Sequence, residues 1–354
     1  MTTIPRPKSD RRISYLRALN ETLDQEMERD PTVILMGEDV AGGAGKEDQG
    51  IIDAWGGAFG FSKGLLPKYG AERVKDTPIS EAGFIGAAVG AAATGLRPVA
   101  ELMFVGFYGV CADQITNNAA KMHYMFGGKV KLPLTILTNI GVGGGQAAQH
   151  SETLYSVFTH FPGLKCVVPS DPYTAKGLLA ASIQDDDPVI YFIHKQLMSS
   201  RGSGPEPLRG WGVPEEPYIF PIGKSDVVKE GADITLIGIG HTTSLCLQAA
   251  EDLGAEGINA EVIDLLSLSP LDEDTIVSSV KKTRRVVITD EDYPRCSIAS
   301  DLSALVAEQA FDYLDAPPCR VTPPHASVPF SSALESLYDP SREKIAAAAR
   351  GLME

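Results

Sequence analysis

A single carboxylate at the head of a long uncharged segment is the first candidate for chemistry in this sequence. Glu81 precedes residues 82–96, AGFIGAAVGAAATGL, in which no side chain is charged. Three glycines in this segment are spaced by three and four residues, so in a helix they share one face, where another backbone can approach closely. A carboxylate fixed at such a contact is suited to proton exchange. The alternative is structural: after Ser80 as a cap, Glu81 would interact favourably with the dipole of an ordinary helix.

A histidine in a glycine-rich connection is the second candidate. His150 ends the stretch GVGGGQAAQH, which follows a strand predicted over 132–140. Open α/β sheets bind ligands beyond the carboxyl ends of their strands, and histidine exchanges protons near neutral pH. This position suits proton transfer, but no second histidine stands at metal-ligand spacing, and the residues alone favour a capping or merely hydrogen-bonded histidine.

Three further side chains occupy predicted strand ends. Phe107 in ELMFVGFYG suits either a binding surface or the core, and the acidic pair Glu38 and Asp39 in MGED suits a turn or a helix cap. The glycine clusters at 141–145 and 238–240 do not complete G-x-G-x-x-G, so they favour flexible turns over a dinucleotide site.

The elements that must position these residues alternate in type along the chain. Helical spacing of apolar residues predicts a helix over 13–27, and apolar runs predict strands over 32–39, 97–104, 132–140, 164–170 and 188–194. Because these runs do not alternate with polar residues, they favour a mostly parallel sheet covered on both faces. The alternation then resumes, with strands predicted over 233–240, 260–265 and 284–292 and helices over 243–257 and 271–282. The sequence therefore predicts an α/β protein of two doubly wound domains.

The boundary between the two predicted domains follows from composition. Residues 196–224 are rich in Gly, Pro, Ser and Glu, which is typical of a linker across the surface. We therefore expect a first domain over 1–195, a linker over 196–224 and a second domain over 225–354.

Charge and cysteine content exclude several classes of protein. The formal net charge of −15 argues against general binding to nucleic acid or anionic membranes. The five cysteines are odd in number and form no C-x-x-C pair, so neither a disulfide framework nor a zinc site is indicated. The N-terminus has no apolar signal core, and no uncharged apolar run reaches the roughly 20 residues of a membrane span. We expect a cytoplasmic protein that acts on a small molecule.

Several longer stretches together resemble a known family. They are DTPISEAGFIGAAVGAAATGLRPVAELMF, DQITNNAAKMHYMFGG, AAQHSE, GLKCVVPSDPYTAKGLL and DDDPVI. In order and spacing they are similar to the β subunit of the thiamine-diphosphate-dependent component of 2-oxoacid dehydrogenase complexes, a transketolase-like family. The tail segments DEDYPRCSIASDLSALVAEQAF and VTPPHASVPFSSALESLYDPS look most like the acetoin dehydrogenase branch. The resemblance implies a pyrimidine-binding domain followed by a transketolase C-terminal domain.

The resemblance also implies roles for individual residues. Glu81 matches the family glutamate that hydrogen-bonds the aminopyrimidine ring and activates the cofactor by proton exchange. Phe107 matches an aromatic residue that packs against the pyrimidine, and Met103 matches a neighbouring pocket residue. His150 matches the histidine that faces the reacting centre and assists the incoming lipoyl group. Val110 stands where the pyruvate branch has glutamine, a departure that slightly weakens the assignment to that branch.

Metal and partner sites are implied in the same way. The partner α chain of the family carries the G-D-G and N-N motif for diphosphate and magnesium, and this sequence contains no G-D-G. This chain is therefore expected to be half of an active site in an α2β2 heterotetramer. Potassium is expected on backbone carbonyls matching Leu134, Ser182, Asp185 and Asp187, with a solvated acidic turn as the alternative. Asp315 matches an acid that docks the lipoyl-bearing acyltransferase component, with an exposed turn acid as the alternative.

The resulting functional hypothesis is an acetoin-cleaving dehydrogenase subunit. The expected reaction releases acetaldehyde and passes an acetyl group to lipoamide, with the cofactor as electron sink. The same machinery acting on pyruvate or a branched-chain 2-oxoacid is one alternative. A non-catalytic α/β scaffold that only pairs with a partner is another.

Overall fold

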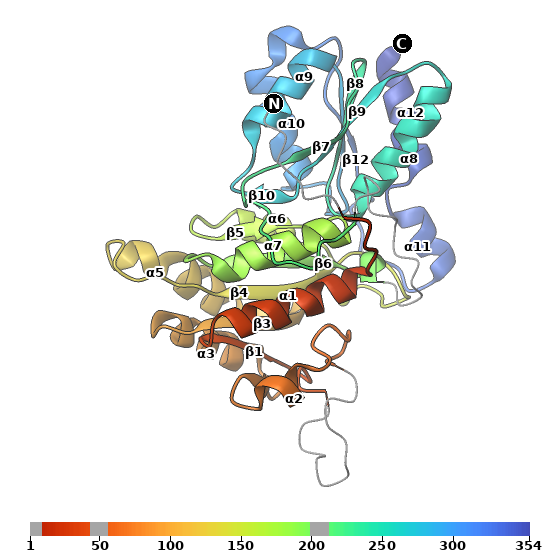
Figure 1. Ribbon diagram of the computed structural model, residues 1–354. Helices are drawn as coiled ribbons and strands as arrows, with labels where there is room; N and C mark the ends of the chain where they lie inside the picture. The colour runs from red at the N-terminus through yellow and green to blue at the C-terminus, as the bar shows by residue number, and fades with distance from the viewer. Residues whose placement is uncertain (1–8, 43–55, 199–211) are drawn as a thin grey trace.

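The computed structural model describes residues 9–42, 56–198 and 212–354, and it contains two β-sheets flanked by helices (Figure 1). The first sheet has the strand order β10-β5-β6-β4-β3-β1-β2. Its strands are β1 (Val33–Gly37), β2 (Val74–Asp76), β3 (Arg97–Phe104), β4 (Thr135–Ile140), β5 (Lys165–Val167), β6 (Val189–His194) and β10 (Ser267–Ser269). All of its neighbouring strands are parallel except β10, which pairs antiparallel with β5.

The helices of the first half cover both faces of this sheet. They are α1 (Tyr15–Arg29), α2 (Leu65–Tyr69), α3 (Glu81–Ala93), η2 (Val105–Phe107), α4 (Tyr108–Asp113), η3 (Gln114–Ala119), α5 (Ala120–Met125), α6 (Tyr155–Thr159), α7 (Pro172–Gln184) and η4 (Lys195–Met198). Alternate residues of the strands belong to two apolar clusters, one shared with α1 and α7 and the other with α3, α5 and α6. Both faces are therefore buried, which explains why the strands read as continuous apolar runs.

The second sheet has the order β12-β11-β8-β9-β7 and lies above the first in Figure 1. Its strands are β7 (Asp226–Lys229), β8 (Ile234–Gly238), β9 (Ala260–Asp264), β11 (Val286–Thr289) and β12 (Cys319–Val321), with β7 antiparallel to β9. The helices are α8 (His241–Ala255), α9 (Glu273–Thr283), α10 (Ile298–Gln309), η5 (Phe311–Tyr313), α11 (Ser332–Tyr338) and α12 (Arg342–Met353). The prediction of two doubly wound α/β units is confirmed.

The two halves share a core and several polar contacts. One apolar cluster runs from β3, β4 and β6 into β8, β9, α9 and α10 without interruption. Strand β10 follows β9 in the chain but completes the edge of the first sheet. His194 Nε2 also lies 2.7 Å from a carboxylate oxygen of Glu291, and both side chains are buried. The relative position of the two sheets is thus fixed by packing as well as by the chain connection.

Part of the predicted linker packs against the protein. Residues 199–211 of this segment lie outside the described residues, whereas 212–224 run along α7. Phe220 is 1% exposed and its N–H donates to the carbonyl of Gly177, while Lys176 donates to the carbonyls of Pro214 and Glu215. The composition of the segment does not reveal these contacts, and the domain boundaries themselves stay a prediction. Within the described ranges, no helix is both long and apolar enough to cross a bilayer.

Candidate active site

The carboxyl ends of four parallel strands bring the predicted functional residues to one edge of the first sheet. Glu38 follows β1, Met103 and Phe107 lie at the end of β3, and the glycine-rich connection to His150 follows β4. Strand β6 ends next to β4 and is followed directly by Lys195. Since this edge is where open α/β sheets bind ligands, the candidates occupy a coherent site.

Glu81 begins α3 and faces a second carboxyl group. Its side chain is buried, with 7% exposed, at the helix end whose dipole favours an anion. Burial, the charge of Glu81 and a hydrogen bond between the two carboxyl groups raise the pKa of Glu38. Ser80 occupies the predicted N-cap position, but its side chain accepts no hydrogen bond from the first turn. Two carboxyl groups thus lie side by side at the start of α3, and the pKa of Glu38 is raised as a result.

A third carboxyl group lies within the sheet below this pair. Glu101 of β3 stands opposite Gly37 in the β1–β3 register and is 1% exposed. Among the described residues neither of its carboxyl oxygens has a hydrogen-bond partner. Burial, with a smaller effect of Glu38 and Asp39, raises the pKa of Glu101 to about 8. This carboxyl group is therefore mostly neutral at pH 7, and the sequence reasoning did not single it out.

Aromatic rings form the wall beside His150. The imidazole stands edge-on to Phe104 at 4.7 Å between ring centres and to Phe107 at 5.7 Å. Phe59 also packs edge-on against Phe104, at 5.7 Å between ring centres. Met103 is half-buried, and its carbonyl accepts a 2.6 Å hydrogen bond from Asn139 of β4. The structure thus brings Met103, Phe107 and His150 together. It adds Phe104, which follows Met103 in strand β3 and which the apolar sequence of that strand did not distinguish from a core residue.

The glycine-rich connection is held at several points. Gly141 has a φ of +89°, and a Cβ there would lie 2.0 Å from His194 Nε2, so only glycine fits. The N–H of Gly143 donates to Glu335 of α11 at 3.2 Å, and Gln196 donates to the carbonyl of Val142 at 3.2 Å. The ammonium of Lys195 donates to the carbonyl of His150. Burial lowers its pKa to about 8, against the opposing effect of Glu335 and Asp339.

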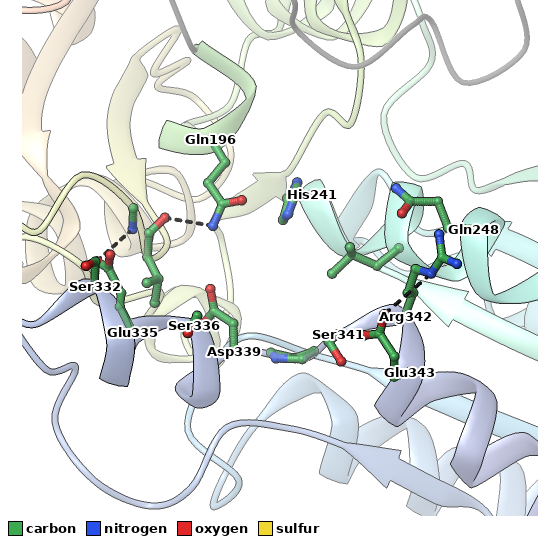
Figure 2. Close-up of a pocket in the computed structure, with 14 residues that line it drawn as sticks. Gln196, His241, Gln248, Ser332, Glu335, Ser336, Asp339, Ser341, Arg342 and Glu343 are labelled. Atoms are coloured by element: carbon green, nitrogen blue, oxygen red, sulfur yellow. Dashed lines mark hydrogen bonds and ion pairs between the residues drawn. The ribbon is translucent and has the colours of Figure 1, made fainter.

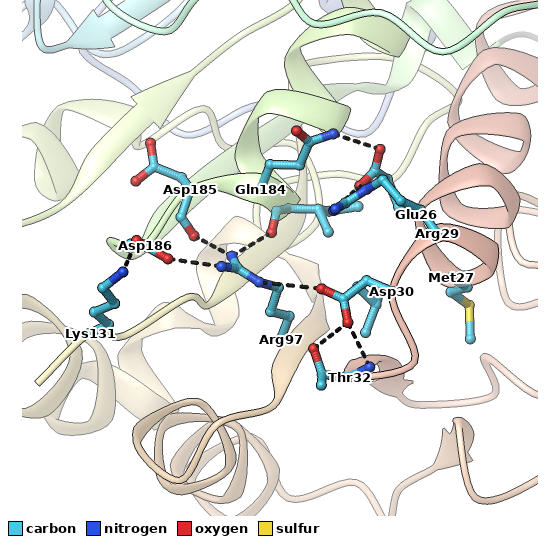
Figure 3. Close-up of polar contacts among 12 residues, drawn as sticks. Glu26, Met27, Arg29, Asp30, Thr32, Arg97, Lys131, Gln184, Asp185 and Asp186 are labelled. Carbon is cyan, nitrogen blue, oxygen red and sulfur yellow. Dashed lines mark hydrogen bonds and ion pairs between the residues drawn. The ribbon is translucent and has the colours of Figure 1, made fainter.

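The predicted potassium ligands lie together at the turn from α7 into β6. Leu134 accepts from the N–H of Val189 at 2.9 Å, and Ser182 accepts from the N–H of Asp185 at 3.4 Å. The guanidinium of Arg97 donates to the carbonyl of Asp185 at 2.9 Å and pairs with Asp186 at 2.8 Å (Figure 3).

The acids of this turn have cationic partners within the chain. Lys165 lies 2.8 Å from a carboxylate oxygen of Asp185 and 3.0 Å from one of Asp187. The carbonyls of Leu134 and Ser182 each accept a backbone N–H and retain a second lone pair, whereas the carbonyl of Asp185 accepts from the cationic guanidinium of Arg97, and the potassium site stays a prediction. The predicted docking acid, Asp315, pairs with Arg284 at 2.6 Å and Arg285 at 3.3 Å.

The cavity in Figure 2 lies between the two halves of the chain, with a volume of about 420 Å³. It is lined by Val142 and Gly143 of the glycine-rich connection and by residues of α8, α11 and α12. Burial raises the pKa of Asp339 to about 8, with smaller effects of Glu291 and Glu335. Burial also lowers the pKa of His241 to about 4. Glu81, Met103, Phe107 and His150 are not among the residues that line this cavity, which meets the glycine-rich connection at Val142 and Gly143.

Comparisons with known proteins define the class. Residues 11–200 match the family described as transketolase, pyrimidine binding domain, and residues 223–345 match transketolase, C-terminal domain. The fold is shared with a solved structure described as split gene transketolase, inactive beta4 tetramer. The two superpose with a TM-score of 0.72 at 23% sequence identity, and the match covers 96% of this chain and 98% of the other. The two sheets are therefore a transketolase-type pyrimidine-binding domain and a transketolase C-terminal domain.

Two relatives narrow the class to a family. The acetoin:2,6-dichlorophenolindophenol oxidoreductase subunit beta of Bacillus subtilis (strain 168) is 52% identical over 94% of this chain and 95% of its own length. The mitochondrial pyruvate dehydrogenase E1 component subunit beta-2 of Oryza sativa subsp. japonica is 42% identical over 94% of this chain and 84% of its own length. The chain belongs to the β subunits of the thiamine-diphosphate-dependent dehydrogenase components, a family of oxidoreductases.

Proposed function

We propose that this chain is the β subunit of an acetoin dehydrogenase component that acts together with an α chain. The observation that carries the proposal is the 52% identity to a β subunit named for acetoin, against 42% to one named for pyruvate, each over 94% of the chain. The overall reaction would cleave acetoin, release acetaldehyde and pass the remaining two carbons as an acetyl group to lipoamide, whose disulfide accepts the two electrons.

The described residues fit the pyrimidine end of thiamine diphosphate. Glu81 offers a buried carboxyl group next to that of Glu38, and Phe104 and Phe107 provide apolar ring surfaces beside His150. When bound, the cofactor supplies a carbon nucleophile and an electron sink. Glu81 would exchange a proton with a ring nitrogen, while Phe107 and Met103 would orient the ring and exclude water.

His150 is assigned to the later half of the reaction. Its half-buried ring packs against both Phe104 and Phe107, at the sheet edge where an incoming lipoyl group would arrive. At this position an imidazole can give a proton to the sulfur that leaves when the lipoyl disulfide opens.

The exposed face of α3 supports contact with another chain. Its buried face packs into the core through Phe84, Ile85 and Val89, whereas Gly83, Ala87, Gly90 and Ala93 are exposed. Small side chains on one face allow close approach of a second backbone, as an α2β2 assembly would require. In that assembly the α chain would supply most of the groups for diphosphate and magnesium.

Two accessory sites complete the proposal. A potassium ion would bind the carbonyls of Leu134, Ser182, Asp185 and Asp187 and stabilise the turn before β6. Asp315 would contribute to docking of the lipoyl-bearing acyltransferase component. Since its carboxylate already pairs with Arg284 and Arg285, docking would use its free side or compete for these arginines.

Steady-state kinetics of the assembled component test the substrate. With the α chain and 2,6-dichlorophenolindophenol as acceptor, kcat/KM for acetoin should exceed that for pyruvate and for 2-oxoisovalerate. A higher value for either oxoacid would assign the chain to another branch of the family. Absence of turnover and of cofactor binding in the assembled protein would support a scaffold instead.

A further inference from the structure

The side chain of Lys195, which directly follows β6, contacts the segment that carries His150 at residues before and after the histidine. Its ammonium donates to the backbone carbonyl of His150, to Gln146 Oε1 at 2.8 Å and to Ser151 Oγ at 3.2 Å. It also lies 5.9 Å from the ring centre of Phe104, the ring against which the imidazole of His150 stands. The three donors of one ammonium group are therefore directed at a single stretch of six residues.

The segment held in this way contains backbone strain. Ala147 adopts a φ of +57°, a left-handed conformation that is costly for a residue with a Cβ. Such a conformation persists only where the surroundings hold it. Lys195 bridges the strained residue, because Gln146 precedes it and His150 follows it.

Lys195 is itself held through its backbone and lies near two acidic side chains. The backbone of Lys195 continues directly from the buried strand β6, in which Ile193 and His194 have no exposed surface. Burial lowers the pKa of Lys195 to about 8, and the charges of Glu335 and Asp339 partly oppose this effect. Glu335 also accepts a hydrogen bond from Gly143 at the start of the same glycine-rich connection.

We propose that Lys195 is a positioning residue for acyl transfer: it holds the His150 segment in place through the carbonyl of His150 and the side chains of Gln146 and Ser151. The inference rests on the role of His150 under the proposed function. Without the ammonium group the strained segment would relax and the imidazole would leave its place against Phe104 and Phe107. Misplacement of a reacting group by about 1 Å can cost 10²-fold in rate.

A double-mutant cycle in the assembled component tests this inference. Lys195→Met keeps the apolar stem and should slow acetyl transfer to lipoamide about 10–10²-fold, with thiamine diphosphate affinity by calorimetry changed less than about threefold. In a His150→Ala background the same change should slow transfer by no more than about twofold, since Lys195 acts through His150. Lys195→Gln, which still donates hydrogen bonds, should lose less than Lys195→Met.

The matched control is a lysine that also donates to a backbone carbonyl, far from His150. Lys229 is half-buried in β7 and donates to the carbonyl of Ala260 at 2.9 Å, so Lys229→Met should leave acetyl transfer unchanged. Equal losses from Lys195→Met in both backgrounds, no loss in either, or collapse of cofactor affinity in both Lys195 variants would overturn the inference. If His150→Ala alone leaves transfer unchanged, the proposed role of His150 fails instead.

Discussion

Replacement of Glu101 by glutamine should flatten the dependence of folding stability on pH. The folded-state pKa of about 8 lies above the ordinary value of 4.5, so the folded protein retains a proton that the unfolded chain releases. The stabilising contribution of the neutral carboxyl group is complete below pH 4.5 and is lost as the pH rises to 8. Since each pH unit in this window costs about 1.4 kcal/mol, the loss is on the order of 5 kcal/mol.

Glu101→Gln has nearly the same volume but cannot ionise. Near pH 5 the neutral carboxyl group of the wild type and the amide of the variant are both unpartnered, so the two proteins should have similar stability there. Relative to the wild type, its free energy of unfolding should then rise by about 5 kcal/mol between pH 4.5 and pH 8.

Urea unfolding of the full chain at several pH values measures this difference. Glu72→Gln is the control, because the side chain of Glu72 is 98% exposed and its replacement should leave the pH dependence as in the wild type. If Glu101→Gln and wild-type protein lose stability in parallel as the pH rises, Glu101 is not held neutral and the reasoning from burial is refuted.

Three further predictions concern the cofactor, the cation and the docking acid. Because this sequence has no G-D-G motif, the isolated chain should bind thiamine diphosphate weakly and its complex with an α chain should bind it tightly. Calorimetry on both samples measures the two affinities. Tight magnesium-dependent binding by the lone chain would contradict a site shared between the chains. Tetramethylammonium is too large to bind among the carbonyls of the turn before β6, so replacing potassium with it should lower the unfolding temperature of the complex. Equal unfolding temperatures in the two salts would contradict the potassium site. Asp315→Asn should weaken binding of the acyltransferase component without changing dye-linked turnover; unchanged affinity would leave Asp315 only as a partner of Arg284 and Arg285.

The sequence was sufficient for the elements that local pattern determines. The apolar runs over 97–104 and 188–194 predicted β3 and β6, and helical spacing over 13–27 predicted a helix that the structure places at Tyr15–Arg29. Both signals arise within one element, from burial on both faces of a strand or one face of a helix. The family resemblance then brought together Glu81, Met103, Phe107 and His150, which the structure places at one sheet edge.

Features that depend on distant parts of the chain were not predictable in this way. The three residues of β10 complete the first sheet although they follow β9 of the second, which no local pattern encodes. The packing of Phe220 against Gly177 and the contacts of Lys195 with the His150 segment likewise require the folded chain. Glu101 was visible as an acid within an apolar run, but its neutral state follows from burial near Glu38 and Asp39.

The central claim is that Glu81 activates a bound cofactor, and hydrogen–deuterium exchange at the thiazolium carbon in the assembled protein tests it before any substrate binds. Glu81→Gln keeps the volume and a hydrogen bond but cannot exchange a proton, so the exchange rate should fall by about 10²–10⁴-fold. The control is Glu273→Gln, since Glu273 is also the first residue of a helix but belongs to α9 in the second half of the chain. A charge at a helix end is worth only about 0.3–1 kcal/mol of stability. Exchange at the wild-type rate in Glu81→Gln would contradict the account and leave Glu81 as a helix-terminus charge.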